Sequence, residues 1–534
     1  MNYPVKRVLI SVSDKTGLIE FAKFLVKNGS EIISTGGTRA ALEAEGIPST
    51  AIEKVTGNPE AFSGRMKTIS FQIGSALLFD RERDQEEALK LGIRPIDLVV
   101  CNLYPFEKFM DKDLESLVEN IDIGGPTMIR AAAKNYKSVG VVVSPEDYTS
   151  LIDEMKNNEG ALTADTRATL MRKAYHHTAD YDAMISTEMD RRFGEKSIRL
   201  SFNKGETLRY GENGHQNAVF YKERNKNNTL YDMKALHGKM LSFNNIVDIN
   251  ASIEGARSLK RSGCVIVKHA TPCGFAEAEN LRSALELAWE GDPVSAFGSI
   301  IAFNEIMDLE TAQYFDLKNS DRSKRKFVEV IIAPAYSDDA LEYLKSHKDL
   351  RVILMDPKQL VRPADIRYLG GSLLLQDQDE KLHNEITCVT KTYPELEMAN
   401  NEFVEFGLKA VRQVKSNAIV IVRKTRQEKF KDSYQMLGMG AGQPNRLNST
   451  RLAIDRAREN LKLENCDDVE TELRKCLLVS DAFFPFPDAI DEIAKAGIKT
   501  VVQPGGSMRD SLVVDRCNEL GLSMLMTGIR HFKH

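Results

Sequence analysis

The chain has 534 residues, and its 72 Lys and Arg against 77 Asp and Glu give a formal net charge of −5 at pH 7. With 42% hydrophobic and 28% charged residues, the composition is typical of a globular protein of about three structural units, which excludes a single-domain chain. The mildly acidic balance provides no field to attract nucleic acid or an anionic membrane, so an anionic ligand must be bound by a local positive site.

Two further classes of protein are excluded by residue patterns. No apolar run approaches the ~18–20 residues that a membrane helix needs, and the first residues enter a strand-like pattern without a signal-peptide core, so we expect a cytoplasmic protein. The seven cysteines are scattered and form no Cys-x-x-Cys pair, which argues against a disulfide framework or a structural zinc site.

Strands and helices alternate in the first half of the chain. Residues Val8–Val12 read as a buried strand, and Thr16–Leu25 show helical spacing of apolar residues. A second strand is predicted at Glu31–Thr35, a turn at Gly36-Gly37 and a helix at Thr38–Glu45. This alternation predicts a parallel sheet with helices on its faces.

The rest of the chain is divided by its polar segments. Further strands are predicted at Asp97–Leu103 and Ser138–Val143, followed by a long helix from about Thr163 to Met189. A polar, turn-rich segment at 191–197 is the best domain boundary, which predicts domains of residues 1–195 and 196–534. Polar stretches at 318–326 and 424–433 are predicted to be surface loops between layers or lobes.

Two turns in the first half are suited to binding phosphate. The first strand leads into Ser11–Gly17 and the second into Ser34–Thr38. In a parallel sheet these turns lie at the carboxyl edge, where free N–H groups, hydroxyls and one lysine can hold an anion. Helix capping alone would select the same residue types, so each turn taken singly also fits a structural role.

Three further segments add charged residues. They are Gly64–Thr68, Cys101–Pro105 and Ile121–Asn135, and in the last of them Gly124-Gly125 breaks the chain just before a helix. The first histidine in the chain is His176, so acid–base chemistry in the first ~175 residues must fall to Lys, Asp or Tyr.

Together these strings resemble the inosine-monophosphate (IMP) cyclohydrolase domain of the bifunctional purine biosynthesis enzymes, which implies a methylglyoxal-synthase-like α/β fold for residues 1–195. By this resemblance the substrate is bound by Ser11, Ser13, Lys15, Ser34, Thr35, Gly36, Gly37, Thr38, Asn102 and Ile123. Catalysis is implied for Arg65, Lys67, Tyr104, Asp122 and Lys134. The chain lacks the two histidines that most family members carry after Lys67-Thr68, so ring closure is expected to rest on the charged residues.

A second constellation lies in the other half. The strand Cys264–Val267 runs into Lys268-His269, followed by Pro272-Cys273. A zinc deaminase would need a second cysteine and a nearby glutamate, and both are missing, so no metal site is expected. A Lys-His pair at a strand end suits acyl transfer instead, because the imidazole can take a proton while the ammonium stabilises developing negative charge.

Eight further strings resemble the transformylase half of the same family, which acts on the aminoimidazole carboxamide ribonucleotide AICAR. They are Leu208–Gln216, Leu241–Ile246, Asp292–Gly298, Phe327–Pro334, Lys415–Ala418, Gly440–Arg446, Ser480–Phe486 and Gly528–His534. The resemblance implies two cytidine-deaminase-like α/β lobes in residues 196–534, with Lys268 and His269 as the catalytic pair. Substrate-binding roles are implied for Arg209, Tyr210, Gly298, Glu329, Asn417, Arg446, Phe483, Arg530, Phe532 and His534, and folate-binding roles for Leu447, Asp488, Gly506 and Ser507. The C-terminal tail is expected to be buried and functional.

The resemblance implies formyl transfer from 10-formyltetrahydrofolate to AICAR, then closure of formyl-AICAR to IMP. It implies small-molecule substrates, formyl-folate as a cosubstrate, no bound cofactor or metal, no nucleic-acid or membrane partner, and a homodimer. Two alternatives stay open at this point. The N-terminal domain could be a nucleotide-binding or regulatory module without catalysis, or the C-terminal half could be a zinc-using relative of the deaminases.

Overall fold

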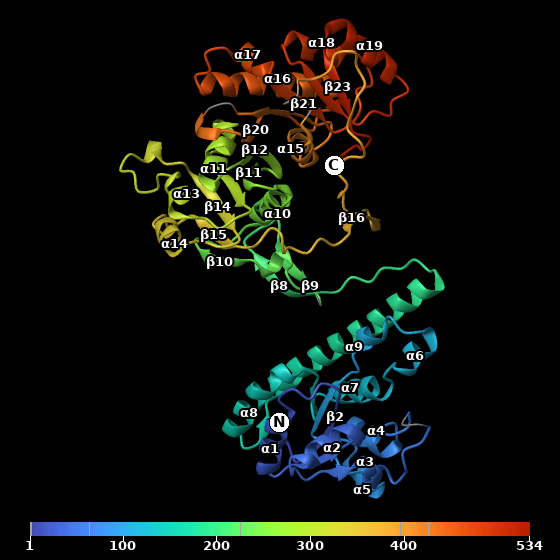
Figure 1. The fold of residues 1–534 in the computed structure, drawn as a ribbon. Coiled ribbons are helices and arrows are strands. Elements are labelled where there is room, and N and C mark those ends of the chain that lie inside the picture. The colour runs from blue at the N-terminus through green and yellow to red at the C-terminus, as the bar shows by residue number, and fades with distance from the viewer. Residues whose placement is uncertain (1–2, 63–64, 225, 396–397, 399, 426–427) are drawn as a thin grey trace. The chain divides into compact units, whose positions relative to one another are not determined.

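The computed structural model describes residues 3–62, 65–224, 226–395, 398, 400–425 and 428–534 (Figure 1). The chain divides into two compact units, a smaller unit of residues 1–201 and a larger unit of residues 202–534. The long helix α9, Ala164–Phe193, begins where the Thr163 side chain accepts the Thr166 N–H, and it ends at Gly194 in a left-handed conformation. It runs four residues beyond the predicted end.

A parallel sheet, with five strands among the described residues, forms the centre of the smaller unit. Its strands, in spatial order, are β4 (Thr50–Ala51), β3 (Glu31–Ser34), β2 (Arg7–Val12), β5 (Leu98–Asn102) and β6 (Gly140–Val142). Their side chains alternate between two buried clusters, with Leu9 and Val99 in one and Val8 and Val100 in the other. The predicted parallel sheet, covered on both faces, is confirmed.

Helices cover both faces of this sheet. They are α1 (Leu18–Lys27), α2 (Gly36–Ala44), α3 (Ile52–Thr56), α4 (Phe71–Leu78), α5 (Gln85–Lys90), α6 (Leu114–Glu119), α7 (Gly124–Lys134) and α8 (Tyr148–Asn157). Helices α1 and α8 pack on one face and α4 and α7 on the other. The turn predicted at Gly36-Gly37 is wrong: Thr35 is extended and both glycines form the first turn of α2, where helical N–H groups need no intrahelical partner.

The larger unit is built on a mixed sheet, which has twelve strands among the described residues. In spatial order they are β10 (Lys234–His237), β15 (Arg351–Leu354), β14 (Val328–Ala333), β13 (Ser299–Phe303), β11 (Ser262–Lys268), β12 (Thr271–Ala278), β20 (Tyr434–Gly440), β19 (Ile419–Lys424), β21 (Cys476–Ser480), β22 (Thr500–Gln503), β23 (Ser523–Met526) and β18 (Thr387–Cys388).

This sheet has two halves with the same strand order. In each half an antiparallel hairpin, β11-β12 or β19-β20, is followed by three mutually parallel strands. The halves meet where β12 and β20 pair antiparallel, with Ala276 opposite Gln435. The described residues of the stretches 318–326 and 424–433 lie between α13 (Leu309–Gln313) and β14 and from the last residue of β19 to β20, so each stretch belongs to one half and does not lie between the halves. A run of polar residues indicates exposure and does not by itself mark a boundary.

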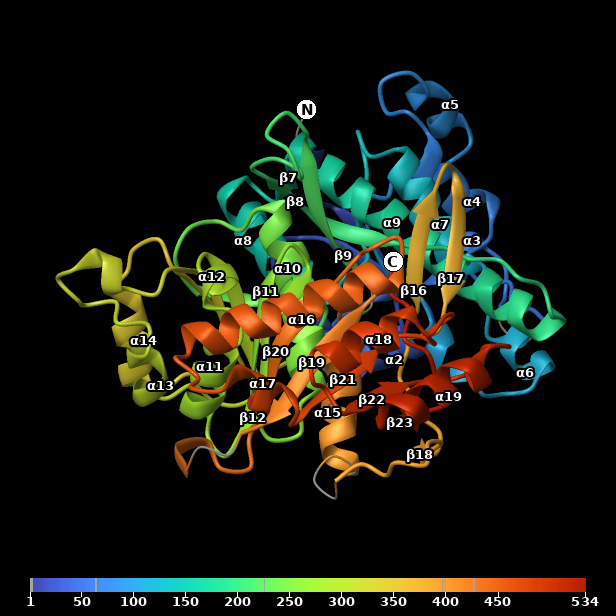
Figure 2. The same cartoon turned by 90° about the horizontal axis from the view of Figure 1, so that it is seen from above.

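The helices of the larger unit lie on both faces of the sheet. They are α10 (Phe243–Ser258), α11 (Leu281–Glu290), α12 (Pro293–Ala296), α13 (Leu309–Gln313), α14 (Asp338–Lys345), α15 (Asn401–Arg412), α16 (Arg446–Leu463), α17 (Val469–Leu473), α18 (Asp488–Lys495) and α19 (Asp510–Leu520). Helices α10 and α15 share one core that runs through both halves. On the other face α11, α13 and α14 cover the first half, and α16, α18 and α19 cover the second, with α16 packed on β20 (Figure 2).

The remaining elements are short. The strand pairs are β1 (Tyr3–Pro4) with β7 (Ala161–Leu162), β8 (Phe202–Leu208) with β9 (Ala218–Glu223), and β16 (Asp365–Leu369) with β17 (Ser372–Gln376). Short 3-10 helices lie at Phe106–Phe109, Pro145–Asp147, Leu230–Asp232, Arg322–Lys324 and Glu428–Phe430. Within the described ranges, no helix is both long enough and apolar enough to cross a bilayer.

A half-buried carboxyl at the end of α11 makes stability depend on pH. Burial, with Glu286 and Glu464 nearby, raises the pKa of Glu290 from 4.5 to about 7. Because the folded chain holds this proton between these two values and the unfolded chain releases it, stability falls as the pH rises through this window. The shift alone corresponds to about 3 kcal/mol, and solvent screening of this partly exposed carboxyl lowers it, so Glu290→Gln is expected to raise the free energy of unfolding at pH 8 by about 2 kcal/mol.

The thermal unfolding temperature measured at pH 5 and pH 8 checks this expectation. The gain should be much smaller at pH 5, and the same change at exposed Glu342 on α14 should have little effect at either pH. An equal gain at both pH values would contradict the titration of Glu290.

Candidate active sites

Three strand ends of the smaller unit are joined by side-chain hydrogen bonds. The Ser11 and Thr35 hydroxyls lie 2.9 Å apart, which links the turn after β2 to the start of α2. The side-chain Oδ1 of Asn102 accepts the N–H groups of Ser13 and Asp14 at 2.7 and 2.9 Å, which links the end of β5 to the same turn. The predicted binding turns therefore meet at the carboxyl edge of the sheet.

Two of the predicted hydroxyls already have backbone partners. Ser34 Oγ donates to Ile10 O at 3.0 Å, and Thr38 Oγ1 donates to Val12 O at 3.1 Å. Both side chains are buried and hold neighbouring turns together. The side chain of Lys15 is exposed beside the turn, with its Nζ 3.5 Å from Ser13 O.

The segment that carries Lys67 lies between two helix N-termini. Lys67 Nζ contacts Glu60 Oε1 at 2.8 Å, and a Cβ added to Gly36, the first residue of α2, would lie 3.8 Å from the same Nζ. At the next residue, Thr68 Oγ1 would lie 2.6 Å from a Cβ at Gly124, the first residue of α7. The cation thus lies beside the first turn of α2, whose N–H groups have no intrahelical partner, an arrangement suited to an anion, whereas at the start of α7 the Gly125 N–H already donates to Asp122.

Asp122 is held just before α7. Its Oδ1 accepts the Gly125 N–H at 2.8 Å, and its own backbone N–H donates to the Tyr181 hydroxyl at 2.8 Å. Burial raises the pKa of this carboxyl, and the N–H groups of Gly125 and Gly124 oppose that effect. A Cβ at Gly125 would lie only 2.5 Å from Asp122 Oδ2, so the glycine leaves room for the carboxylate.

The other residues predicted for ring closure are less enclosed. Arg65 is exposed and pairs with Glu119 of α6 at 2.5 Å, while Tyr104 and Ile123 are also exposed. Lys134 is the last residue of α7, about 15 Å along the helix axis from Gly124. Asp122 and Lys134 line the same groove, of about 580 Å³, beside α7. Gly64 lies outside the described residues.

Strand register brings the predicted residues of the larger unit to one edge of its sheet. Lys268 is the last residue of β11. Because Val267 pairs with Ile300, and Ser299 pairs with Val328, Gly298 and Glu329 lie at the same edge of the sheet as Lys268. On the other side of the β12-β20 pair, Ile419 at the start of β19 pairs with Gly440 at the end of β20 and with Ser480 at the end of β21. Asn417 and the residues that follow β20 and β21 therefore lie at the same edge. Strands β22 and β23 also end there.

The Lys268-His269 pair lies at a tight hairpin turn between β11 and β12. Lys268 pairs with Thr271, and the two residues between them, His269 and Ala270, both have positive φ angles of 55° and 56°. Two positive φ angles are those of a type I′ turn, a conformation that costs a residue other than glycine about 1 kcal/mol. The imidazole is exposed at the tip, and Lys268 Nζ donates to Phe297 O at 2.9 Å.

Two residues of α10 that sequence reasoning missed support this edge. Asp248 accepts the backbone N–H groups of His269 and Ala270, and Asn245 Nδ2 donates to Glu329 Oε2 at 3.1 Å. They are three residues apart and therefore share a helix face. Their three-residue spacing is the sequence signal that could have paired them.

Arg446 and Asn417 are brought together in a buried network. Arg446 pairs with the buried Asp481 and donates to Asn417 Oδ1 at 2.9 Å, and Asn417 Nδ2 donates to Gln443 O at 2.8 Å. The Ser416–Asn417 peptide is cis. The Arg446 charge is thus neutralised within the protein, and a substrate would meet the exposed edge of this network.

The residues predicted to bind folate lie in the second half of the sheet, at the starts of α16 and α18 and in the glycine turn after β22. Leu447 and Asp488 lie in the first turns of α16 and α18, which pack together, and Phe483 is half-buried between β21 and α18. The N–H groups of Gly506 and Ser507 donate to Asp510 Oδ2 at 2.7 and 3.1 Å. This bond shapes the glycine turn after β22.

The expectation of a buried tail is wrong for the tail residues that were predicted to bind substrate. His531 is 1% exposed and anchors the tail through Asp379 at 2.7 Å and Leu382 O at 2.8 Å. Its neighbours Arg530 and Phe532, as well as His534, are exposed, because alternate residues of an extended segment point to opposite sides. Arg530 lies over the Phe532 ring, as Arg209 lies over that of Tyr210.

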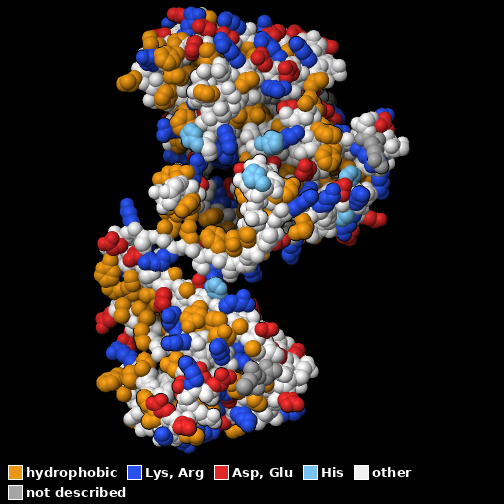
Figure 3. Space-filling view, turned by 180° about the vertical axis from the view of Figure 1, so that it is seen from behind, with side chains coloured by type: hydrophobic (Ala, Val, Ile, Leu, Met, Phe, Trp, Pro, Cys, Tyr) orange, Lys and Arg blue, Asp and Glu red, His pale blue; other side chains and the backbone are white. Residues whose placement is uncertain are grey.

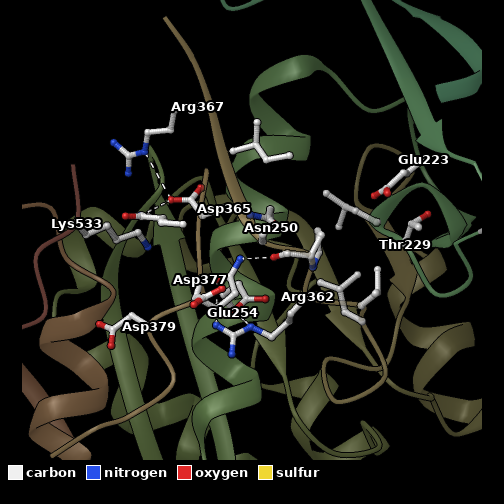
Figure 4. Close-up of a pocket in the computed structure, with 18 of the residues that line it drawn as sticks. Glu223, Thr229, Asn250, Glu254, Arg362, Asp365, Arg367, Asp377, Asp379 and Lys533 are labelled. Carbon is white, nitrogen blue, oxygen red and sulfur yellow. Dashed lines mark hydrogen bonds and ion pairs between the residues drawn. The ribbon is translucent and has the colours of Figure 1, made fainter. Parts of the chain in front are cut away.

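A cavity of about 500 Å³ adjoins the tail, with Lys533 and Arg362 among its lining residues (Figure 4). Arg362 forms an ion pair with Glu254 at 3.2 Å, and Lys533 donates to the backbone oxygen of the neutral Gln413. Burial lowers the pKa of Lys533. On the face of the larger unit seen in Figure 3, Lys, Arg and His side chains surround a hollow.

The cysteine of the deaminase-like string is part of the core. The Cys273 thiol is buried, donates to Ile266 O at 3.5 Å, and has a pKa raised to about 12 by burial. A thiol so held is a poor metal ligand, because metals bind the thiolate. No group of three or more potential metal-binding residues is found in the part of the chain that the structure describes.

Comparisons with known proteins show which family the chain resembles. A family model described as AICARFT/IMPCHase bienzyme matches residues 132–456, and one described as MGS-like domain matches residues 17–127. The bifunctional purine biosynthesis protein PurH of Ruminiclostridium cellulolyticum is 40% identical over 545 residues, covering 99% of this chain and 100% of its own. PurH of Persephonella marina is 41% identical over 544 residues, with the same coverage.

A solved structure described as "Crystal structure of ForH" is 30% identical and covers 34% of this chain and 98% of its own, with a TM-score of 0.32. The two curated relatives match along essentially the whole chain, and the first family model spans more than half of it. The resemblance drawn from the ordered motifs is therefore confirmed, and the chain belongs to the AICARFT/IMPCHase bienzyme family.

Proposed function

We propose that, in this bifunctional enzyme, the larger unit transfers a formyl group from 10-formyltetrahydrofolate to AICAR and the smaller unit closes formyl-AICAR to IMP. The observation that carries the proposal is that each unit has its own sheet edge where motif residues of the family converge. Lys67 lies near the N-terminus of α2 in one unit, and in the other Lys268-His269 lies on the same sheet edge as Asn417.

Formyl transfer needs a base because the AICAR amine is a poor nucleophile, its lone pair being delocalised into the ring and carboxamide. His269 takes the amine proton as nitrogen attacks the formyl carbon, and Lys268 stabilises the resulting oxyanion. The oxyanion then collapses, the bond to N10 breaks, and protonated N10 leaves as tetrahydrofolate. A base and an oxyanion donor each contribute about 10²–10³ in rate.

Ring closure joins two groups of one molecule. The carboxamide nitrogen attacks the formyl carbon, and the formyl oxygen leaves as water after gaining two protons. Holding these atoms in line supplies most of the rate gain. Lys67 stabilises the developing oxyanion, and Asp122, whose carboxyl has a pKa raised by burial, is suited to supply a proton.

The family resemblance supports four further parts of the proposal. Formyl-folate is consumed as a cosubstrate rather than held as a cofactor, and the chemistry above needs no metal. We also propose a homodimer and a cytoplasmic location. The residue roles, the folate contacts and the domain limits at 195 and 196 are parts of the same proposal.

The proposal is tested by supplying AICAR and 10-formyltetrahydrofolate to the purified chain and following formyl-AICAR and IMP. Both products are expected, and supplied formyl-AICAR alone should yield IMP. Accumulation of formyl-AICAR without IMP would favour the alternative in which the smaller unit only binds nucleotide. Stoichiometric zinc in the active protein would favour the deaminase-like alternative.

A methyl group at Gly125 tests the smaller site. Gly125→Ala places a Cβ 2.5 Å from Asp122 Oδ2 and 2.6 Å from Leu103 Cδ2, so the carboxylate must move. Ring closure of supplied formyl-AICAR is expected to fall more than tenfold, because a displaced acid loses its proton-transfer geometry. Formyl transfer should be unchanged.

Gly74→Ala is the matched control, since this glycine is also helical and a Cβ there meets nothing within 4 Å. It should leave both activities intact. Normal ring closure by Gly125→Ala would show that the position of Asp122 is not critical.

A further inference from the structure

The turn that carries Lys268 and His269 adopts a conformation its residues do not favour. His269 and Ala270 both have φ near +55°, the region that glycine occupies freely and alanine rarely enters. Such strain persists only where the surroundings over-determine the backbone. Something must therefore hold this turn.

The Asp248 carboxylate supplies that support. Its Oδ2 accepts the His269 N–H at 3.3 Å and its Oδ1 accepts the Ala270 N–H at 2.6 Å, so each oxygen binds one of the two strained residues. Asp248 is half-buried in the middle of α10, a sixteen-residue helix whose Ile249 and Ile253 are fixed in the core. The carboxylate therefore stands on a rigid element.

The same helix face fixes a second part of the edge. Asn245, one turn before Asp248, accepts the Ser242 N–H through its oxygen and donates to Glu329 through its nitrogen. Glu329 is one of the residues proposed to bind substrate. One face of α10 thus positions both the hairpin turn and β14.

We propose that Asp248 is a positioning residue for formyl transfer: its two carboxylate oxygens hold the His269–Ala270 turn in the left-handed conformation that presents the imidazole beside Lys268. This inference rests on the proposed role of His269. Asp248 touches no reacting atom and acts only through the two backbone N–H groups.

The sharpest variant is Asp248→Asn, which keeps size and shape. An amide has one acceptor oxygen, so its NH₂ group must face one of the two N–H groups, and that bond is lost. Formyl transfer is expected to fall at least tenfold in kcat with a smaller change in the KM for AICAR, because the base is misplaced while the substrate contacts stay. Ring closure by the same chain should keep its wild-type rate and so report that the chain is folded.

A second substitution separates positioning from a general structural role. Ala270→Gly lets the turn adopt positive φ without strain, so in this background the loss caused by Asp248→Asn is expected to shrink to about threefold or less. Asp308→Asn is the matched control, since Asp308 caps α13 through a single N–H that asparagine can also bind. It should change transfer by less than twofold.

Three outcomes are decisive. Wild-type transfer by Asp248→Asn, or an equal loss with and without Ala270→Gly, would overturn the positioning role of Asp248. Full transfer by His269→Ala in the same assay would instead overturn the proposed base. A loss that Ala270→Gly relieves supports the inference.

Discussion

Replacing His269 by alanine is expected to lower formyl transfer from 10-formyltetrahydrofolate to AICAR by at least about 10²-fold. The imidazole is exposed at the tip of the β11-β12 turn, and its ring has no hydrogen-bond partner among the residues that the structure describes, so it is free to accept a proton from a bound amine. Cyclisation of supplied formyl-AICAR should proceed at the wild-type rate, because that chemistry belongs to the other unit.

The His269 measurement follows both reactions in one preparation. His176→Ala is the control, since His176 is exposed on α9 and has no proposed role. Adding imidazole to the His269→Ala protein should restore part of the transfer if only the base is missing. Transfer that stays near the wild-type rate would show that another group removes the amine proton.

The sequence predicts the smaller unit well because its strands carry the signal that periodicity can detect. Short β-branched runs such as Val8–Val12, buried on both faces, alternate with helices of clear apolar spacing. The start of α2 is less predictable, because two consecutive glycines usually indicate a turn, whereas here they form the first turn of a helix. Tertiary contacts decided that detail.

The topology of the larger unit could not be predicted in the same way. Motifs as far apart as Lys268 and the residues after β23, which ends at Met526, meet at one edge only because β12 pairs with β20 and joins two halves of like order. Pairing between distant strands leaves no trace in local residue patterns. Resemblance to the family, not spacing, is what placed Lys268 and Asn417 in one site.

Within the sites, residue types were predictable and their partners were not. The Lys268-His269 string indicates acid–base chemistry, but the positive φ angles of the turn and the Asp248 support depend on α10. Likewise Arg446 is identifiable as a candidate cation, while its pairing with buried Asp481 depends on the end of β21. Such contacts follow from packing across the fold.

Lys67→Ala is expected to stop ring closure, with a loss of at least about 10²-fold, while leaving formyl transfer unchanged. Lys67 supplies the positive charge that lies near the N-terminus of α2, and Glu60 at 2.8 Å holds it there. The checking measurement is IMP formation from supplied formyl-AICAR.

Lys67→Arg distinguishes charge from proton transfer. Arginine keeps the positive charge but does not release a proton near neutral pH, and its planar fork differs in shape from an ammonium. If Lys67 acts by charge alone, Lys67→Arg should recover a substantial part of the ring-closure rate that alanine loses; if it also moves a proton, both variants should be similarly slow. Lys90→Ala, at an exposed lysine in the last turn of α5, should close the ring normally. Ring closure at the wild-type rate by Lys67→Ala would remove Lys67 from the site and leave Asp122 as the group to test next.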